Sequence, residues 1–143
     1  MSTRSNIAIE LEDGTVKSIY CHFDGYVGYV GQTLFEHYQD RKKVEKLIEL
    51  GSISSLYPEV DIPNGSKHSF EKPEDGITVA YHRDRGEEKH IEIDKSAKDF
   101  FKDINGMIEY GYLFTHAGEW LAKSAYGTFK GIIPLEDAIK KVS

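Results

Sequence analysis

The stretch Ser5-Asn-Ile-Ala-Ile-Glu-Leu-Glu-Asp-Gly-Thr-Val-Lys-Ser-Ile-Tyr-Cys-His-Phe23 decides the fold, because it reads as two β-strands joined by a tight turn. Asp13-Gly14 is typical of a two-residue type I′ hairpin turn, in which both central residues have positive φ. That turn predicts that Glu10 faces Lys17, and it fixes which side chains share a face. The remaining predicted pairs are Leu11 with Val16, Ile9 with Ser18 and Ile7 with Tyr20. The predicted core face holds Ile7, Ile9, Leu11, Val16 and Tyr20.

Beyond the hairpin, hydrophobic periodicity and turn residues predict alternating helices and strands. The helices are expected over 32–39, 40–50, 96–105 and 134–142, with the first two as one bent unit or as two helices. Ser96 with Asp99 resembles a capping box at the start of the third helix, and Gly51 is well placed to end the second. Pro134 is expected at the first position of the last helix. The strands are expected over 77–82, around Ile91 and Ile93 as its partner, over 108–114 and over 120–126. The sequence therefore predicts an α+β fold: an antiparallel sheet of about five to six strands, with three to four short helices packed on one face.

Length and composition limit the architecture and the class of protein. A chain of 143 residues predicts a single domain over 1–143, and residues 57–76 form a long loop with three of the four prolines. One cysteine excludes an internal disulfide framework and fits a reducing compartment. The start of the chain has no signal-peptide pattern and no apolar run approaches 18 residues, so we expect a cytoplasmic protein without a membrane partner. The net charge of −6 disfavours direct contact with nucleic acid.

Two His-x-Asp triplets suggest a divalent metal such as zinc. His22 and Asp24 follow the second hairpin strand, and His82 and Asp84 end the strand predicted over 77–82. On a strand, residues two apart share one face, so each triplet would present an imidazole and a carboxylate together. The candidate ligands are His22, Asp24 and His82, with Asp84, His37 or Cys21 as the fourth. The alternative is that Asp24 and Asp84 are turn residues beside hydrogen-bonded histidines.

A ligand site is suggested by glycines at every third position and by two arginines. Gly28 lies at the centre of Gly25-Tyr-Val-Gly28-Tyr-Val-Gly31, directly before a helix whose free N–H groups favour an anion. Arg83 and Arg85 could clamp a carboxylate or a phosphate. The glycine stretch is not a Walker A motif, so the alternatives are a turn with unusual backbone angles and a charged β-turn at the arginines.

The aromatic residues favour a protein interface. Tyr26 and Tyr29 lie in the glycine stretch, where a core position is hard to provide, and exposed tyrosine is frequent at interfaces. Base stacking is the competing use, which the net acidity disfavours. No Ser-His-Asp or Cys-His signature is present, a thiol enzyme would depend wholly on Cys21, and the remaining histidines read as surface or satisfied residues.

Several segments form an ordered set that resembles a group of small proteins encoded by bacterial phages and prophages. The set comprises Ser18-Ile-Tyr-Cys-His-Phe-Asp-Gly-Tyr26, Leu34 with His37-Tyr38, Leu50-Gly-Ser-Ile-Ser-Ser-Leu56, Ala80-Tyr-His-Arg-Asp-Arg-Gly-Glu87, Tyr112-Leu-Phe and Gly118-Glu-Trp120. The resemblance spans most of the chain and transfers no catalytic residue. It implies an accessory protein of a mobile element, acting in a bacterial cytoplasm. Small proteins of that kind include counter-defence factors such as anti-CRISPR inhibitors.

Two hypotheses of function follow. In the first, the chain is a stoichiometric binder and inhibitor of a bacterial host protein, such as a CRISPR effector or another defence component, and not an enzyme. In the second, it is a module that binds phosphorylated nucleotides, or a metal-dependent hydrolase, which uses the glycine stretch with Arg83 and Arg85. The oligomeric state is open in both.

Overall fold

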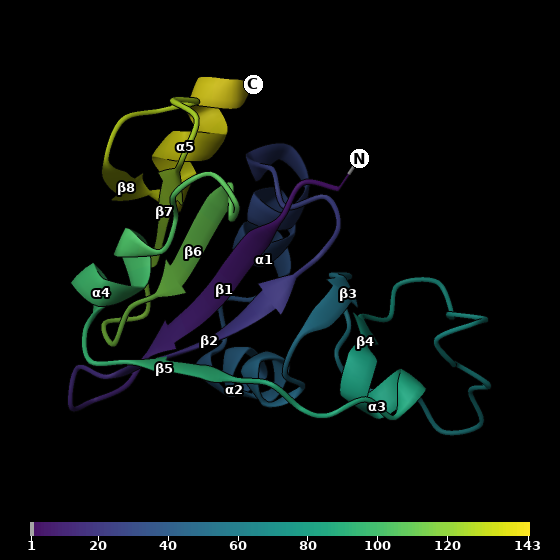
Figure 1. Cartoon of the computed structure of the whole chain (residues 1–143). Coiled ribbons are helices and arrows are strands. Elements are labelled where there is room, and N and C mark those ends of the chain that lie inside the picture. Colours follow the sequence, from purple (N-terminus) through teal and green to yellow (C-terminus); the bar gives the residue numbers. More distant parts are fainter. Residues whose placement is uncertain (1) are drawn as a thin grey trace.

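The computed structural model describes residues 2–143, which form a mixed eight-stranded sheet with helices on both faces (Figure 1). The strands are β1 (Ser5–Glu10), β2 (Val16–Cys21), β3 (Ile53–Ser55), β4 (Val79–Ala80), β5 (Glu92–Asp94), β6 (Tyr110–Phe114), β7 (Trp120–Ser124) and β8 (Ile132–Pro134). The helices are the π-helical turn η1 (Val27–Gly31) and α1 (Gln32–His37), α2 (Arg41–Glu49), α3 (Tyr81–Arg85), α4 (Ala97–Lys102) and α5 (Leu135–Val142). The predicted α+β class is confirmed.

The sheet is larger than predicted and only partly antiparallel. Its strand order is β4-β3-β2-β1-β6-β7-β8, and β5 pairs with the first half of β2. β1 pairs with β6 in parallel and β2 pairs with β3 in parallel, so the expectation of a wholly antiparallel sheet is wrong. Parallel strands need a long crossover, which η1, α1 and α2 provide between β2 and β3.

The hairpin register differs by one residue from the prediction. Glu10 pairs with Val16 and Ile7 pairs with Ile19. The turn is longer than a type I′ turn, because the Leu11 N–H donates to the Thr15 carbonyl (2.8 Å). Gly14 does have positive φ (+88°), as predicted, but Asp13 does not. These features match a three-residue hairpin loop that ends in a left-handed glycine.

This register moves side chains between the faces of the sheet. Ile7 and Ile9 face the main core as predicted, and Cys21 joins them there. Val16 lies on the opposite face, where it packs in the second cluster with Ala8. Tyr20 also leaves the predicted core face, since it alternates with Cys21 along the strand.

The helices cover both faces of the sheet, so the expectation that they pack on one face is wrong. α1, α2 and α5 lie over the main core, whereas α4 packs on the other face (Figure 1). Phe100, Phe101 and Ile104, in α4 and directly after it, bury themselves against Ala8 and Leu113. The centre of β1 is therefore buried on both sides, which explains its run of three apolar residues, Ile7-Ala8-Ile9.

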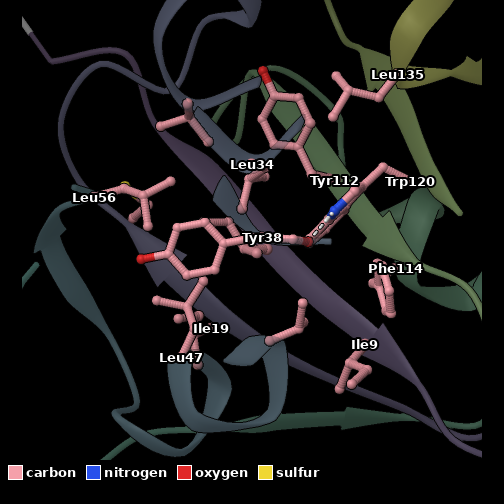
Figure 2. Close-up of a cluster of buried hydrophobic side chains, with 14 of the residues drawn as sticks. Ile9, Ile19, Leu34, Tyr38, Leu47, Leu56, Tyr112, Phe114, Trp120 and Leu135 are labelled. Carbon is pink, nitrogen blue, oxygen red and sulfur yellow. Dashed lines mark hydrogen bonds between the residues drawn. The ribbon is translucent and has the colours of Figure 1, made fainter. Parts of the chain in front are cut away.

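Buried aromatic side chains with satisfied polar ends tie the main core together (Figure 2). The Trp120 Nε1–H donates to the Tyr38 carbonyl over 2.8 Å, drawn as a dashed line in Figure 2. The Tyr38 hydroxyl donates to the Tyr57 carbonyl (2.6 Å), and the Tyr112 hydroxyl donates to the Gly25 carbonyl (2.7 Å). The core thus fixes the chain after β2, at Gly25, and at the first residue of the long loop, Tyr57.

The strand predicted over 77–82 is wrong beyond Ala80, where α3 begins. The Asp84 carboxylate accepts the Ala80 N–H over 2.8 Å, in the manner of a capping box, and Gly86 (φ +75°) ends the helix. The predicted partner strand at Ile93 pairs with β2 instead of β4. His82 and Asp84 are thus on a helical turn and do not share a strand face.

The helix caps agree better with the prediction. The Ser96 hydroxyl accepts the Asp99 N–H (3.2 Å) at the start of α4, and Gly51 follows α2 with φ +76°. Pro134 precedes α5 as its cap residue instead of occupying its first position. No helix formed by residues 2–143 has the length and apolar character needed to cross a bilayer.

Candidate functional site

Aromatic side chains gather where β2 ends. Tyr20 and His22 are joined by a hydrogen bond between the Tyr20 hydroxyl and His22 Nδ1 (2.7 Å). The His22 ring meets Phe23 edge to face, with 4.5 Å between centroids. Phe23 is 42% exposed and Tyr26 is 44% exposed. The end of β2 therefore presents two large aromatic side chains to solvent.

The backbone that carries Phe23 and Tyr26 is held rigidly. Asp24 has φ +56°, a left-handed conformation that asparagine and aspartate adopt more readily than other non-glycine residues. The Gly25 N–H donates to the Thr3 carbonyl over 2.8 Å. A Cβ on Gly25 would lie 2.7 Å from Ser5 Cβ and Oγ, so only glycine fits this approach. The turn is thus fastened to the start of β1 and, through Tyr112, to the core.

The π-helical turn η1 follows directly and contains the other two glycines of the stretch, Gly28 and Gly31. Gly31 packs closely, because a Cβ there would lie 3.2 Å from Leu135 and 3.3 Å from Val27. Gly28 is exposed, and the nearest atoms to a Cβ there belong to the Tyr26 ring (3.6 Å). Gly28 is therefore adjacent to an aromatic side chain, and η1 packs against α1 and α5.

Four neighbouring strands end together beside this turn. Cys21 pairs with Ser5, Ser5 with Tyr110, and Tyr110 with Ser124. Hydrogen bonds continue the row past the strand ends, since the Glu109 N–H donates to the Arg4 carbonyl (3.0 Å) and the Ala125 N–H donates to the Glu109 carbonyl (2.8 Å). At about 4.8 Å per strand step, the row from β2 to β7 spans roughly 15 Å.

Two further exposed apolar side chains lie at this end of the sheet. Met107, before β6, is 75% exposed and Tyr126, after β7, is 68% exposed. The Tyr126 hydroxyl donates to the Gly106 carbonyl (2.8 Å), which joins the two loops. We call Phe23, Tyr26, Met107 and Tyr126 the sheet-end surface.

The two tyrosines predicted for an interface have different surroundings. Tyr26 is exposed and belongs to the sheet-end surface. Tyr29 is partly buried: its hydroxyl donates to the Leu56 carbonyl (3.0 Å) and its ring meets Tyr57 edge to face. Burial raises the pKa of Tyr29 to about 12. Tyr29 therefore stabilises η1 through its contacts with Leu56 and Tyr57.

The arginines predicted for ligand binding are engaged within the protein. Arg83 donates to the carbonyls of Val60 (2.5 Å) and Thr78 (2.7 Å), and its Nε–H donates to the Asp84 carboxylate (2.8 Å). The Arg85 guanidinium lies over the Phe70 ring, 4.2 Å from its centroid, and pairs with Glu87. Both belong to α3, which packs beside β4, whereas Gly28 belongs to η1.

Asp84 also binds a histidine of the long loop. His68 Nε2 lies 3.0 Å from Asp84 Oδ2, and the Glu74 N–H donates to His68 Nδ1 over 3.0 Å. The Phe70 N–H donates to the Asp84 carbonyl (3.3 Å). Together with Arg83, these contacts fasten the loop of residues 57–76 to α3, so His68 is a satisfied histidine and not a surface one.

The structure does not bring the proposed metal ligands together. Across residues 2–143, no three His, Cys, Asp or Glu side chains are grouped to hold a metal ion. His22 contacts Tyr20, His82 Nδ1 lies 2.7 Å from the Glu87 carbonyl, and Asp24 forms an exposed turn. Two of the suggested fourth ligands are also placed elsewhere. Asp84 is hydrogen-bonded to His68 and Arg83. His37 is exposed at the end of α1.

Cys21 is unsuited to nucleophilic chemistry. Its side chain is fully buried in the main core, and that burial raises the pKa of the Cys21 thiol to about 12. A thiol in this state is almost wholly protonated at neutral pH. Cys21 therefore packs in the main core as a small apolar side chain.

Sequence reasoning did not single out Met107, and it assigned Tyr126 to a strand. Both lie in loops whose proximity to Phe23 depends on the parallel pairing of β1 with β6. The only local signal is the Asn105-Gly106 turn before Met107.

No family model matches this chain, and no curated protein or solved structure is significantly similar to it.

Proposed function

We propose that this chain is a stoichiometric binder and inhibitor of a bacterial host protein, with the sheet-end surface as its contact. The observation on which this rests is that Phe23, Tyr26, Met107 and Tyr126 are all exposed at one end of the sheet. Exposed apolar patches on proteins mark interaction sites, and aromatic residues and methionine are enriched in interface cores.

Rigidity of the surface supports the same proposal. Gly25 is locked against β1, and the Tyr126 hydroxyl is bound to the Gly106 carbonyl, so little conformational entropy remains to be lost on binding. The resemblance to phage and prophage proteins suggests a CRISPR effector or another defence component as the target, in the host cytoplasm.

The alternative, a phosphorylated-nucleotide module or a metal-dependent hydrolase, has no observation in its favour. The Arg83 side chain is taken up by Val60, Thr78 and Asp84. An anion at Arg83 would have to displace these bonds, each of which satisfies a buried or half-buried group. We therefore do not propose that function.

Capture from bacterial lysates followed by mass spectrometry tests the proposal. Wild-type protein should retain one specific host protein in a one-to-one complex, whereas the Phe23→Ala/Tyr26→Ala variant should not. Ile93→Ala is the matched control: Ile93 is 67% exposed and pairs with Lys17, at the opposite end of β2. Retention of no specific protein from several host strains, or equal retention by the double variant, would contradict the proposal.

A further inference from the structure

The charge of this protein is segregated along the chain. Residues 57–94 hold ten acidic and five basic residues, which gives −5 of the net charge of −6. They form the long loop, β4 and α3, which lie on the right of Figure 1, and β5, which runs below β2 in the same view. We call residues 57–94 the acidic segment.

The sheet-end surface is nearly neutral by comparison. In the backbone segments that form it, 3–5, 22–26, 106–110 and 125–128, the acidic and basic residues are Arg4, Asp24 and Glu109, so their net charge is −1. The exposed area there is supplied by rings and a thioether, not by carboxylates. A basic groove that binds nucleic acid needs a dense array of negative charge opposite it, and this surface has none.

We infer that the contact surface of the partner is apolar and nearly uncharged, and that it is not a basic nucleic-acid-binding groove. This inference rests on the proposed function and specifies the chemistry of the partner at the same site. The segregation of charge supports it, because a chain that mimicked nucleic acid would place its carboxylates at the contact. Here the excess of acidic over basic residues lies on the acidic segment, while the exposed side chains at the contact include Phe23 and Tyr26.

Salt dependence distinguishes the two kinds of partner surface. Raising NaCl from about 0.1 M to about 1 M shortens the Debye length from about 10 Å to about 3 Å, which weakens contacts between exposed charges. The captured host protein is purified, and its dissociation constant for wild-type protein is measured by interferometry at both concentrations. We expect a change of less than about twofold, because apolar contacts are not screened.

Two variants make the test specific to the surface. Glu71→Gln/Asp75→Asn/Glu88→Gln neutralises three exposed residues of the acidic segment and should leave the dissociation constant within about twofold. Phe23→Ala, as an interface aromatic, should weaken binding about tenfold or more.

The outcomes separate this inference from the proposed function. Capture that fails altogether overturns the proposed function, and the inference with it. Capture that succeeds but weakens more than about tenfold in high salt, or in the triple variant, keeps the binder and overturns the apolar contact. Capture that is insensitive to Phe23→Ala overturns the choice of surface.

Discussion

His68 donates its Nε2 proton to Asp84 Oδ2 over 3.0 Å, and both side chains are almost completely withdrawn from solvent, with 0% and 2% exposed. The donor is assigned by chemistry, because the Glu74 backbone N–H can only donate and therefore requires a bare Nδ1. The pair joins the middle of a twenty-residue loop to α3. Loops of this length are usually functional or mobile, and this contact explains how one is held in place.

Replacing Asp84 should release the loop. In Asp84→Asn, the bonds from Arg83, His68 and the Ala80 N–H lose their charged acceptor, and the Arg83 guanidinium keeps only the neutral Val60 and Thr78 carbonyls as acceptors. We expect the free energy of unfolding to fall by about 3 kcal/mol, with faster proteolysis within 57–76. Asp75→Asn, in the same loop but exposed, is the control and should change neither. Equal protease resistance of both variants would contradict the anchoring role.

The contribution of Asp84 should depend on pH in a defined direction. Burial opposes ionisation, but hydrogen bonds from Arg83, the Ala80 N–H and His68 outweigh it and lower the pKa of Asp84. An aspartate in the unfolded chain has a pKa of about 3.9, so the stabilisation is complete above that value and is lost as pH falls through the lower folded-state pKa. Chemical denaturation should show the gap between wild type and Asp84→Asn constant above about pH 5 and narrowing below about pH 4. A gap that widens on acidification would be inconsistent with this assignment.

Gly25 and Gly28 form a matched pair of substitutions. Gly25→Ala would place a Cβ 2.7 Å from Ser5 Cβ and 2.8 Å from the Thr3 carbonyl, so the turn after β2 must shift. We expect a loss of about 1–3 kcal/mol in stability, together with weaker capture of the partner. Gly28→Ala meets nothing closer than 3.6 Å and should leave the stability nearly unchanged. The account of the turn would be wrong if the two variants melted at the same temperature.

The hairpin turn is testable through Gly14. With φ at +88° and no atom within 4 Å of the position that a Cβ would take, Gly14→Val suffers backbone strain without a packing clash. The expected cost is about 1 kcal/mol or more, seen as a lower melting temperature. An unchanged melting temperature would show that the backbone does not need its left-handed conformation at this position.

Features that depend on neighbouring residues, such as helix caps, could be predicted from the sequence. Features that depend on contacts between residues distant in the sequence could not. The Ser96 cap and Gly51 follow from side-chain chemistry within one turn of helix, and both appear as expected. The register failed by one residue because the Asp13 carboxylate accepts the Thr15 N–H and stabilises a longer loop. α3 was missed because its start depends on Asp84, which accepts the Ala80 N–H and is held in place by His68 of the long loop.

The candidate surface was predictable only in part. Tyr26 stood out because a tyrosine between closely spaced glycines has few places to bury itself. The approach of Met107 and Tyr126 depends on β1 pairing with β6, two strands about a hundred residues apart. Nothing in the local pattern of either strand specifies that pairing, so the sequence could not assemble the surface.

Hydrogen–deuterium exchange of the wild-type protein, with and without the captured host protein, tests the central claim most directly. Residues 22–28, 106–109 and 125–128 should exchange more slowly in the complex, because the partner covers the sheet-end surface and excludes water from its backbone. Exchange within 57–94 should be unchanged. Slower exchange confined to 57–94, with the sheet-end segments unaffected, would contradict the account.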